Sequence, residues 1–133
     1  MKRLFTFLLT IVLLAGLTAP FQAHASTGGK LIALTFDDGP GPYTNRLLDG
    51  LKTRGVQATF FMLGQRAAAY PGVVERAYRE GHQIANHSYS HVNLTGQTNS
   101  GVKSQIRDTN SQLDKACGAG TSYLIRAPYG SAN

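Results

Sequence analysis

Short apolar runs alternate, from Lys30 onward, with segments in which apolar residues recur at helical spacing. Glycine, proline or polar residues bound the runs, as is typical of strands. We predict strands at Lys30–Phe36, Ala58–Leu63, His82–Asn86 and Tyr123–Ile125. Strands that alternate with helices indicate a parallel α/β sheet, either doubly wound or closed as a barrel, although four strands are few for a barrel.

The segments between these strands have the start and stop signals of helices. A first helix is predicted from Thr44, a suitable N-cap, to a stop at Gly55. Pro71 opens a second helix that ends at Gly81, and no helix is predicted between the second strand and Pro71. The helical stripes consist of Leu47, Leu48 and Leu51, then Val73, Val74, Ala77 and Tyr78, and then Val102, Ile106 and Leu113.

The first predicted strand is nearly continuous in apolar residues from Leu31 to Leu34. Such a run suits a strand that is buried on both faces, as in a parallel sheet. The next segment, Asp37–Pro42, is dense in glycine and proline and is predicted to be a loop.

Side chains that could take part in catalysis or bind a metal follow three of the predicted strands. They lie in Thr35–Pro40, in His87–His91 and in Arg126–Gly130. The carboxyl ends of parallel strands share one edge of a sheet, where the working groups of such folds gather. We therefore expect the three segments to face one pocket.

His87 and His91 have a spacing that suits metal binding. Residues four apart lie on the same side of one helical turn, where both imidazoles can bind a single ion. Asp37 and Asp38 offer carboxylates from another strand end, and on an extended chain they point in opposite directions, which suits two separate roles. One carboxylate with two imidazoles leaves open positions for water, as in catalytic sites. The alternative is a pair of solvent-facing histidines and a tight turn at Asp38-Gly39.

The Arg126–Gly130 segment allows two interpretations. Pro128 and Gly130 could simply set a rigid turn after a strand. Alternatively, Arg126 pairs with a buried carboxylate and a backbone N–H beside Tyr129 faces a developing oxyanion. The segment alone does not decide between them.

Together the three segments resemble the signature of the polysaccharide deacetylases, the NodB-homology family, also called carbohydrate esterase family four. Thr35–Pro40 reads Thr-Phe-Asp-Asp-Gly-Pro, His87–His91 fits His-Ser/Thr-x-x-His, and Arg126–Gly130 fits Arg-x-Pro-Tyr-Gly. Their order and spacing agree as well, and the resemblance extends from Lys30 to the end of the sequence. It implies an α/β fold, the N-terminal part of a distorted (β/α) barrel of the NodB-homology type with about four of its strands present.

The resemblance also implies a role for each site residue. Asp37 would be the general base, Arg126 would orient that carboxylate, and the main-chain N–H of Tyr129 would stabilise the tetrahedral intermediate. The ligands of a divalent metal would be Asp38, His87 and His91. Zn²⁺ is the expected metal because it suits imidazole and carboxylate, and Co²⁺, Mn²⁺ or Ni²⁺ also fit such a site.

The family's later motifs have no counterpart in the sequence. These are an Asp-rich segment with Trp and a Leu-x-His segment whose histidine is the general acid, whereas this chain has no Trp and no histidine after His91. We therefore expect 26–133 to be the N-terminal portion of a deacetylase domain that is incomplete at its C-terminus. Without the acid the chain is expected to be a weak or inactive enzyme, and an unclosed parallel sheet is expected to be poorly stable.

Residues 1–25 have the pattern of a secretory signal peptide. Lys2 and Arg3 precede an apolar stretch, Leu4–Leu17, which is short for a membrane span, and Ala23-His24-Ala25 offers a small-x-small cleavage site. We expect a secreted protein, extracellular or associated with the cell wall, with no stable membrane anchor after cleavage. An uncleaved anchor is the alternative, and Pro20 argues against it because it ends the apolar run early.

The charge and the single cysteine argue against nucleic-acid binding and against an internal disulfide. Removal of the leader leaves a net charge of about +4, and the remaining lysines and arginines are scattered, so nucleic-acid binding is not indicated. The single cysteine, Cys117, cannot form an internal disulfide, and both Cys117 and His82 are interpreted as structural. We expect a monomer that binds an acetylated polysaccharide.

The leading hypothesis is a metal-dependent hydrolase that removes acetyl groups from N-acetylated polysaccharide, namely peptidoglycan, chitin or chito-oligosaccharide. Three alternatives stay open: an acetyl xylan esterase, a non-catalytic carbohydrate- or metal-binding fragment, and a family relative that acts on small cyclic amides in the cytoplasm. The predicted signal peptide argues against the last. No residue in the sequence distinguishes between the polysaccharides.

Overall fold

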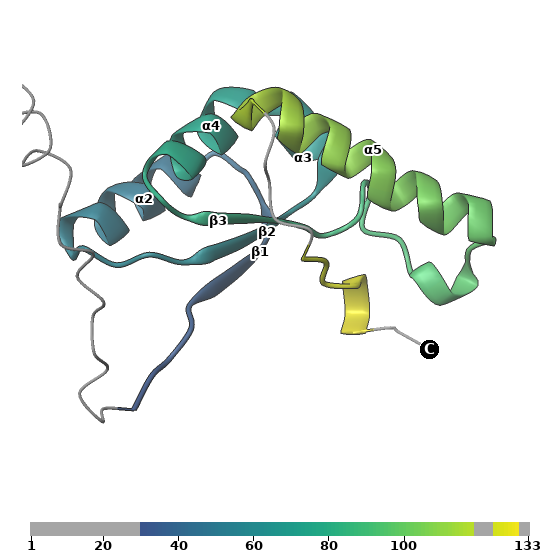
Figure 1. Ribbon diagram of the computed structural model, residues 1–133, viewed down its shortest axis with the longest axis horizontal. Coiled ribbons are helices and arrows are strands. Elements are labelled where there is room, and N and C mark those ends of the chain that lie inside the picture. Colours follow the sequence, from purple (N-terminus) through teal and green to yellow (C-terminus); the bar gives the residue numbers. More distant parts are fainter. Residues whose placement is uncertain (1–29, 119–123, 131–133) are drawn as a thin grey trace, which may run out of the picture. The chain divides into compact units, whose positions relative to one another are not determined.

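Three parallel strands form the sheet of the computed structural model: β1 (Thr35–Gly39), β2 (Thr59–Met62) and β3 (Gln83–Asn86). They lie in the order β1-β2-β3, which is also their order along the chain (Figure 1). Ile125 forms an isolated parallel bridge with Asn86, so the chain continues on the far side of β3.

The structure describes residues 30–118 and 124–130. The predicted signal peptide at 1–25 lies outside the described residues, and so does Tyr123 of the fourth predicted strand. In the ranges that are described, no helix is both long and apolar enough to cross a membrane.

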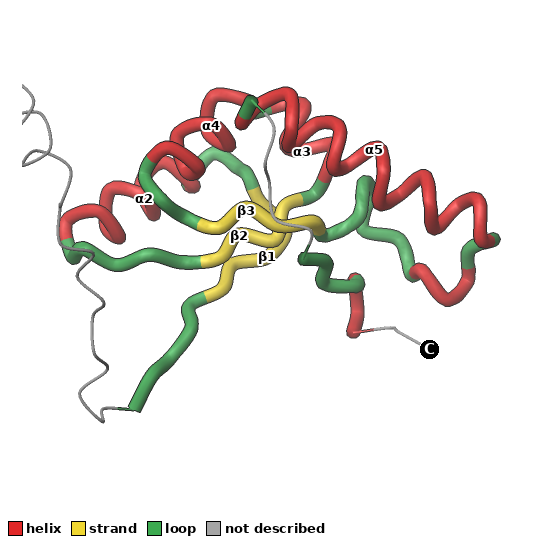
Figure 2. Tube along the Cα trace, viewed as in Figure 1, coloured by secondary structure: helices red, strands yellow, loops and turns green. Residues whose placement is uncertain are grey.

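The helices cover one face of the sheet (Figure 2). They are α2 (Thr44–Thr53), α3 (Gly64–Ala69), α4 (Pro71–Arg79) and α5 (Asn99–Cys117), with short 3₁₀ turns at Leu94–Gly96 and Pro128–Gly130. A doubly wound sheet carries helices on both faces, whereas a (β/α) barrel keeps them outside consecutive strands. The strand order and the single helical layer therefore agree with part of a barrel, and the expected α/β fold is confirmed.

The core lies between the helices and the sheet. Its largest side chains with almost no exposure are Leu48, Met62, Val74, Ile84 and Leu113. Each such burial contributes about 1.5–3 kcal/mol to folding. The helix stripes predicted from the sequence supply most of this core, but Tyr78, which was assigned to the same stripe as Val74, is 38% exposed.

The helix ends follow from local sequence. Thr98 caps α5 with its side chain, which accepts a hydrogen bond from Gly101 N at 3.2 Å. Gly118 ends the same helix in the left-handed region at a φ of 77°, a conformation that costs glycine little. The prediction of Thr44 as an N-cap was wrong by one position: Tyr43 is the N-cap of α2, and Thr44 Oγ1 instead accepts from Gly41 N at 2.9 Å.

The first strand begins later than the sequence predicted. Pairing with β2 starts where Thr59 N donates to Leu34 O at 2.9 Å, and β1 then includes Asp37 and Gly39, which were predicted to lie in a loop. In the described part of the chain, Lys30–Ala33 precede this pairing and belong to no strand. Ile32 is consequently 86% exposed, so the expectation of a strand buried on both faces was wrong here.

Two further elements differ from the predictions. A short helix, α3, begins at Gly64, where the sequence indicated only a break. Of the fourth predicted strand, the structure describes Leu124 and Ile125, and only Ile125 forms a bridge. The two residues are aligned as a strand would be: Asn86 N donates to Leu124 O at 2.9 Å, and Arg126 N donates to Asn86 O at 3.0 Å.

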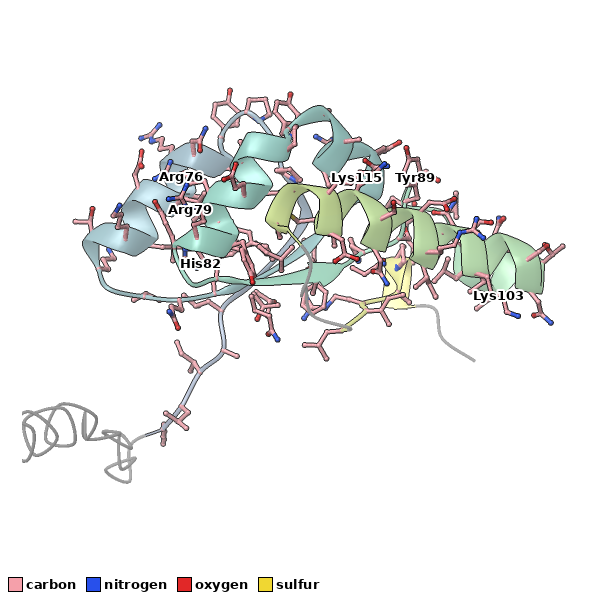
Figure 3. The ribbon with its side chains drawn as sticks, turned by 45° about the horizontal axis from the view of Figure 1, so that its top comes forward. Arg76, Arg79, His82, Tyr89, Lys103 and Lys115 are labelled. Atoms are coloured by element: carbon pink, nitrogen blue, oxygen red, sulfur yellow. The ribbon has the colours of Figure 1, made fainter. Side chains whose placement is uncertain are left out.

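Arg76 ties α4 to α2 on the outer surface (Figure 3). Its guanidinium donates to Asp49 and Asn45 of α2, and its Nε lies 3.1 Å from Glu80. These contacts lower the pKa of the Glu80 carboxyl group, chiefly through the hydrogen bond from Arg76. The network therefore links α2 to α4, two helices that β2 and α3 separate in the sequence.

His82 and Cys117 are both packed into the structure. His82 is 4% exposed, its Nδ1 accepts from Ala58 N at 3.1 Å, and its ring meets Phe60 edge-on. Burial lowers the pKa of this imidazole. Burial likewise raises the pKa of the Cys117 thiol to about 11, so the thiol stays protonated and unreactive.

The lowered pKa of His82 predicts a pH-dependent stability. A neutral His82 accepts the Ala58 N–H, so its contribution is present above the unfolded pKa of about 6.5 and is lost as the pH falls below that value toward the folded pKa. His82→Asn keeps an acceptor that does not titrate. The variant should be less stable by about 1–3 kcal/mol near neutral pH but should lose less of its free energy of unfolding between about pH 7.5 and about pH 5.5. Urea melts at both pH values measure this, and parallel losses in the two proteins would contradict it.

Candidate metal centre

Asp38, His87 and His91 converge at the carboxyl edge of the sheet. Asp38 Oδ1 lies 3.5 Å from His87 Nε2 and 3.3 Å from His91 Nε2. One ligand atom from each of the three side chains lies within 4.8 Å of the other two. The structure thus brings together the three residues that the sequence predicted as metal ligands.

These distances fit a shared cation. Ligands of a tetrahedral zinc ion at bond lengths of about 2.0–2.1 Å lie about 3.3 Å from one another. Two imidazole nitrogens and a carboxylate are also the donor types that such an ion takes. The spacing and the chemistry of the donor set therefore both fit a divalent metal.

The buried His87 is oriented by a backbone carbonyl. Its Nδ1 lies 2.7 Å from Arg126 O, and because a carbonyl only accepts, Nδ1 carries the proton. The other nitrogen, Nε2, then directs a lone pair toward Asp38. Two acceptors facing each other repel unless a cation or proton lies between them, so this arrangement favours a bound metal.

The two histidines do not lie on a helical turn, contrary to the prediction. The segment from His87 to His91 contains two non-glycine residues in the left-handed region, Ser88 at a φ of 69° and His91 itself at 57°. Side chains stabilise this path, since Ser88 N donates to Asn86 Oδ1 at 2.8 Å and His91 N donates to Ser88 Oγ at 3.1 Å. The imidazoles still meet, with ring centroids 5.1 Å apart.

Gln105 of α5 holds this loop from outside and was not identified from the sequence. Its Oε1 accepts from Tyr89 N at 2.8 Å and from Ser90 N at 3.0 Å, and its Nε2 lies 3.1 Å from Ser90 Oγ. The residue lies far from the loop in sequence and belongs to no motif. Only the packing of α5 against the sheet shows its role.

Replacing Gln105 with Leu should weaken metal binding without touching a ligand. The change leaves two backbone N–H groups unpaired, at a cost of about 1–3 kcal/mol in stability, and outer contacts of this kind change metal affinity about tenfold or more. Competition with a chromogenic chelator measures the affinity for Zn²⁺. Gln112→Leu, two turns further along α5, is the matched control, and equal affinities in the two variants would contradict the role of Gln105.

Asp37 has a different partner from Asp38. Arg126 Nη1 lies 2.6 Å from Asp37 Oδ1 and 3.1 Å from Thr35 Oγ1, and the guanidinium lies 4.0 Å above the Phe61 ring. Arg126 thus pairs with a carboxylate, but the side chain of Asp37 is 37% exposed, whereas the sequence predicted a buried partner. The catalytic roles of the two residues stay predictions.

A kink in β1 separates the two carboxylates. The ladder between β1 and β2 shifts register between Phe36 and Gly39, and Asp38 has a φ of 64°. A bulge of this kind re-aims side chains at a strand end. Both carboxylates line one hollow of about 310 Å³. Asp37 and Asp38 thus lie at the same site, although Asp37 contacts Arg126 and Asp38 contacts the two imidazoles.

Tyr129 lies beside the same cluster. Its backbone is left-handed at a φ of 59°, and its ring meets the His91 ring edge-on with centroids 4.7 Å apart. The side chain is 72% exposed. The structure thus brings Tyr129 to the site, and the use of its main-chain N–H stays a prediction.

Comparison with known proteins gives a consistent result. A family model described as polysaccharide deacetylase matches residues 24–133. The peptidoglycan-N-acetylmuramic acid deacetylase PdaC of Bacillus subtilis is 42% identical over 118 residues, which are 88% of this chain and 25% of PdaC. A chitin deacetylase of Pestalotiopsis sp is 43% identical over 112 residues, which are 82% of this chain and 37% of that protein.

Solved structures agree in fold. A family 4 carbohydrate esterase from Streptomyces lividans, in complex with acetate, matches with a TM-score of 0.73 at 41% identity and covers 77% of this chain and 53% of that chain. The chain therefore spans between a quarter and about half of the length of these relatives.

Proposed function

Because the chain belongs to the polysaccharide deacetylase family, we propose that it carries the metal-binding and base-bearing part of an enzyme that removes acetyl groups from N-acetylated polysaccharide. The observation that supports this most directly is the cluster of Asp38, His87 and His91 beside a second carboxylate, Asp37, which is held by Arg126.

The proposed chemistry is hydrolysis of the acetamide. Asp38, His87 and His91 would hold a divalent ion, which would supply a Lewis acid for the acetamide carbonyl and for the attacking water. Asp37 accepts the proton that the attacking water gives up, and Arg126 holds that carboxylate in position. The C–N bond then breaks, and the departing nitrogen takes a proton from solvent, because residues 1–133 contain no counterpart of the family's general-acid histidine. Asp37 returns its proton to solvent, and the amine and acetate are released.

Tyr129 completes the proposed set. Its main-chain N–H is assigned to the oxyanion that develops when water adds to the carbonyl. The nearness of Tyr129 to His91 supports this assignment, because the carbonyl oxygen must lie beside the same cluster. Donors to an oxyanion lower a barrier by about 3 kcal/mol in other hydrolases.

The substrate is proposed to be peptidoglycan, chitin or chito-oligosaccharide. The names of the relatives support this, since PdaC is a peptidoglycan-N-acetylmuramic acid deacetylase and the Pestalotiopsis protein is a chitin deacetylase. Zn²⁺ is the proposed metal on the basis of its ligand types. Secretion after cleavage of a signal peptide at 1–25 and action as a monomer are part of the same proposal.

Acetate release tests the proposal. The protein, incubated with Zn²⁺ and an N-acetylglucosamine oligomer or purified peptidoglycan, should release acetate slowly, because residues 1–133 contain no counterpart of the family's general-acid histidine. Removal of the metal with a chelator should stop this release. Acetate from O-acetylated xylan alone would favour an esterase instead. Acetate release from N-acetylated glycans that a chelator does not affect, or failure of the Zn²⁺-loaded protein to bind any N-acetylated glycan, would contradict the proposed function.

A further inference from the structure

Two side chains in the hollow beside the carboxylates have no part in the proposed chemistry. The hollow is lined by Asp37, Asp38, Gly39, Gly41, Pro42, Tyr43, Thr44, Leu47 and Arg66. Of these, Tyr43 presents an aromatic ring and Arg66 presents a guanidinium. Their position next to the reacting groups suits recognition of the substrate rather than its chemistry.

Tyr43 is an exposed aromatic residue on a fixed backbone. Its side chain is 81% exposed, while its carbonyl accepts from Leu47 N at 3.1 Å in the first turn of α2. It also borders a second hollow of about 400 Å³ that is lined by Tyr43, Arg46, Leu47, Gly50, Leu51 and Arg54. An exposed ring between two hollows offers an apolar face on which the C–H face of a pyranose can stack.

Arg66 carries a charge that no group within the described residues neutralises. Over residues 30–118 and 124–130 its guanidinium forms no ion pair and no hydrogen bond. Its Nη1 extends over the loop after β1, where a Cβ added to Gly41 would lie 3.7 Å away. The two nearby carboxylates are engaged elsewhere, since Asp37 pairs with Arg126 and Asp38 faces the imidazoles.

A guanidinium that is not neutralised beside a reaction centre suits a planar anion. Arginine binds carboxylates through two parallel N–H donors, which gives both affinity and orientation. Arg126 offsets the charge of Asp37, and a divalent ion would more than offset that of Asp38. An anionic substituent can therefore enter this hollow without net repulsion.

We propose that this hollow is a sugar subsite in which Tyr43 stacks on a pyranose ring and Arg66 binds a carboxylate on that sugar. The preferred substrate is then an acidic N-acetylated polysaccharide, with a carboxylate-bearing sugar at or next to the residue that loses its acetyl group. This inference rests on the proposed function and narrows its substrate class.

Two oligosaccharides of equal length test the subsite. One is a neutral N-acetylglucosamine oligomer, and the other alternates N-acetylglucosamine with N-acetylmuramic acid, which carries a carboxylate. Calorimetric binding is measured on Asp37→Asn protein, so that no turnover occurs. The acidic oligomer should bind more tightly than the neutral one. Arg66→Gln should raise the dissociation constant of the acidic oligomer about tenfold and that of the neutral oligomer less than about twofold. Tyr43→Ala should raise the dissociation constants of both oligomers by about threefold or more.

Arg107→Gln and Tyr78→Ala are the matched controls. Arg107 lies on α5 and Tyr78 on α4, and neither lines the hollow with the carboxylates. The controls should change both dissociation constants less than about twofold, and all variants at these exposed positions should melt within about 3 °C of the parent.

The outcomes separate this inference from the function. If the unchanged protein releases acetate but Arg66→Gln leaves both affinities unchanged, or weakens both equally, the subsite proposal is overturned and the function stands. If discrimination between the oligomers depends on Arg66 but acetate release from them does not depend on the metal, the subsite is supported and the proposed reaction is overturned.

Discussion

Replacing Asp37 with Asn is expected to lower kcat for acetate release by about two to four orders of magnitude. The amide keeps the size of the side chain and can still accept from Arg126, whose Nη1 lies 2.6 Å away in the parent. What it loses is the ability to take a proton from water. Steady-state release of acetate from an N-acetylated oligosaccharide, followed in the presence of excess Zn²⁺, measures the effect.

The same variant should keep its metal. The three proposed ligands do not include Asp37, so the affinity for Zn²⁺ should stay within about threefold of the parent value. Asp49→Asn is a matched control, because Asp49 also pairs with an arginine, Arg76, but on the outer surface between α2 and α4. Retention of more than about one-tenth of the activity in Asp37→Asn would contradict its role as the base.

Replacing Asp38 with Ala is expected to abolish most of the stabilisation by metal. A ligand at about one hundred times its Kd stabilises a protein by about 2.7 kcal/mol, which corresponds to about 10 °C in Tm for a unit of this size. Loss of one of three ligands should raise the Kd for Zn²⁺ by about a hundredfold and remove nearly all of that shift. Melting curves with and without Zn²⁺ measure it.

Asp108→Ala provides the comparison for this variant. Asp108 is an aspartate on α5 whose recorded ion pair is with the adjacent Arg107, so its loss should leave the Zn²⁺-induced shift in Tm unchanged. A shift in Asp38→Ala as large as that in the parent would show that the ion binds elsewhere. The proposed metal centre would then be wrong.

The order of elements was predictable from the sequence, and the reason is visible in the core. Leu48, Val74 and Leu113 recur on helical stripes and are buried in one cluster with Phe60 of β2 and Ile84 of β3. Apolar periodicity reports burial directly, so it located α2, α4, α5, β2 and β3. Apolar periodicity does not show whether a neighbouring strand is present for an apolar run to pair with. The predicted first strand therefore included residues that are exposed, such as Ile32.

The convergence of the predicted ligands could be anticipated from the sequence, but the backbone geometry could not. Two of the motifs contain Asp38, His87 and His91, and the structure brings these side chains together. The helical turn expected for the histidines was wrong because their loop takes its shape from tertiary hydrogen bonds, above all those to Gln105 on α5. A spacing rule assumes a regular backbone, and it has no information on such distant contacts.

The orientation of His87 shows the same limit. Its Nδ1 meets the carbonyl of Arg126, a main-chain group that any residue at that position would supply. No side-chain pattern can signal a backbone acceptor. From the sequence, the Arg126 side chain could be assigned to a carboxylate. The contact of its carbonyl oxygen with His87 could not be predicted, because it depends on the bridge between Asn86 and Ile125.

The central claim is that one divalent ion binds among two imidazoles and a carboxylate at the edge of the sheet. The zinc K-edge X-ray absorption spectrum of the protein loaded with one equivalent of Zn²⁺ tests it most directly. We expect a first shell with two imidazole nitrogens at about 2.0–2.1 Å and oxygens for the remaining ligands. A spectrum with one imidazole or none, or with a sulfur ligand, would contradict the assignment.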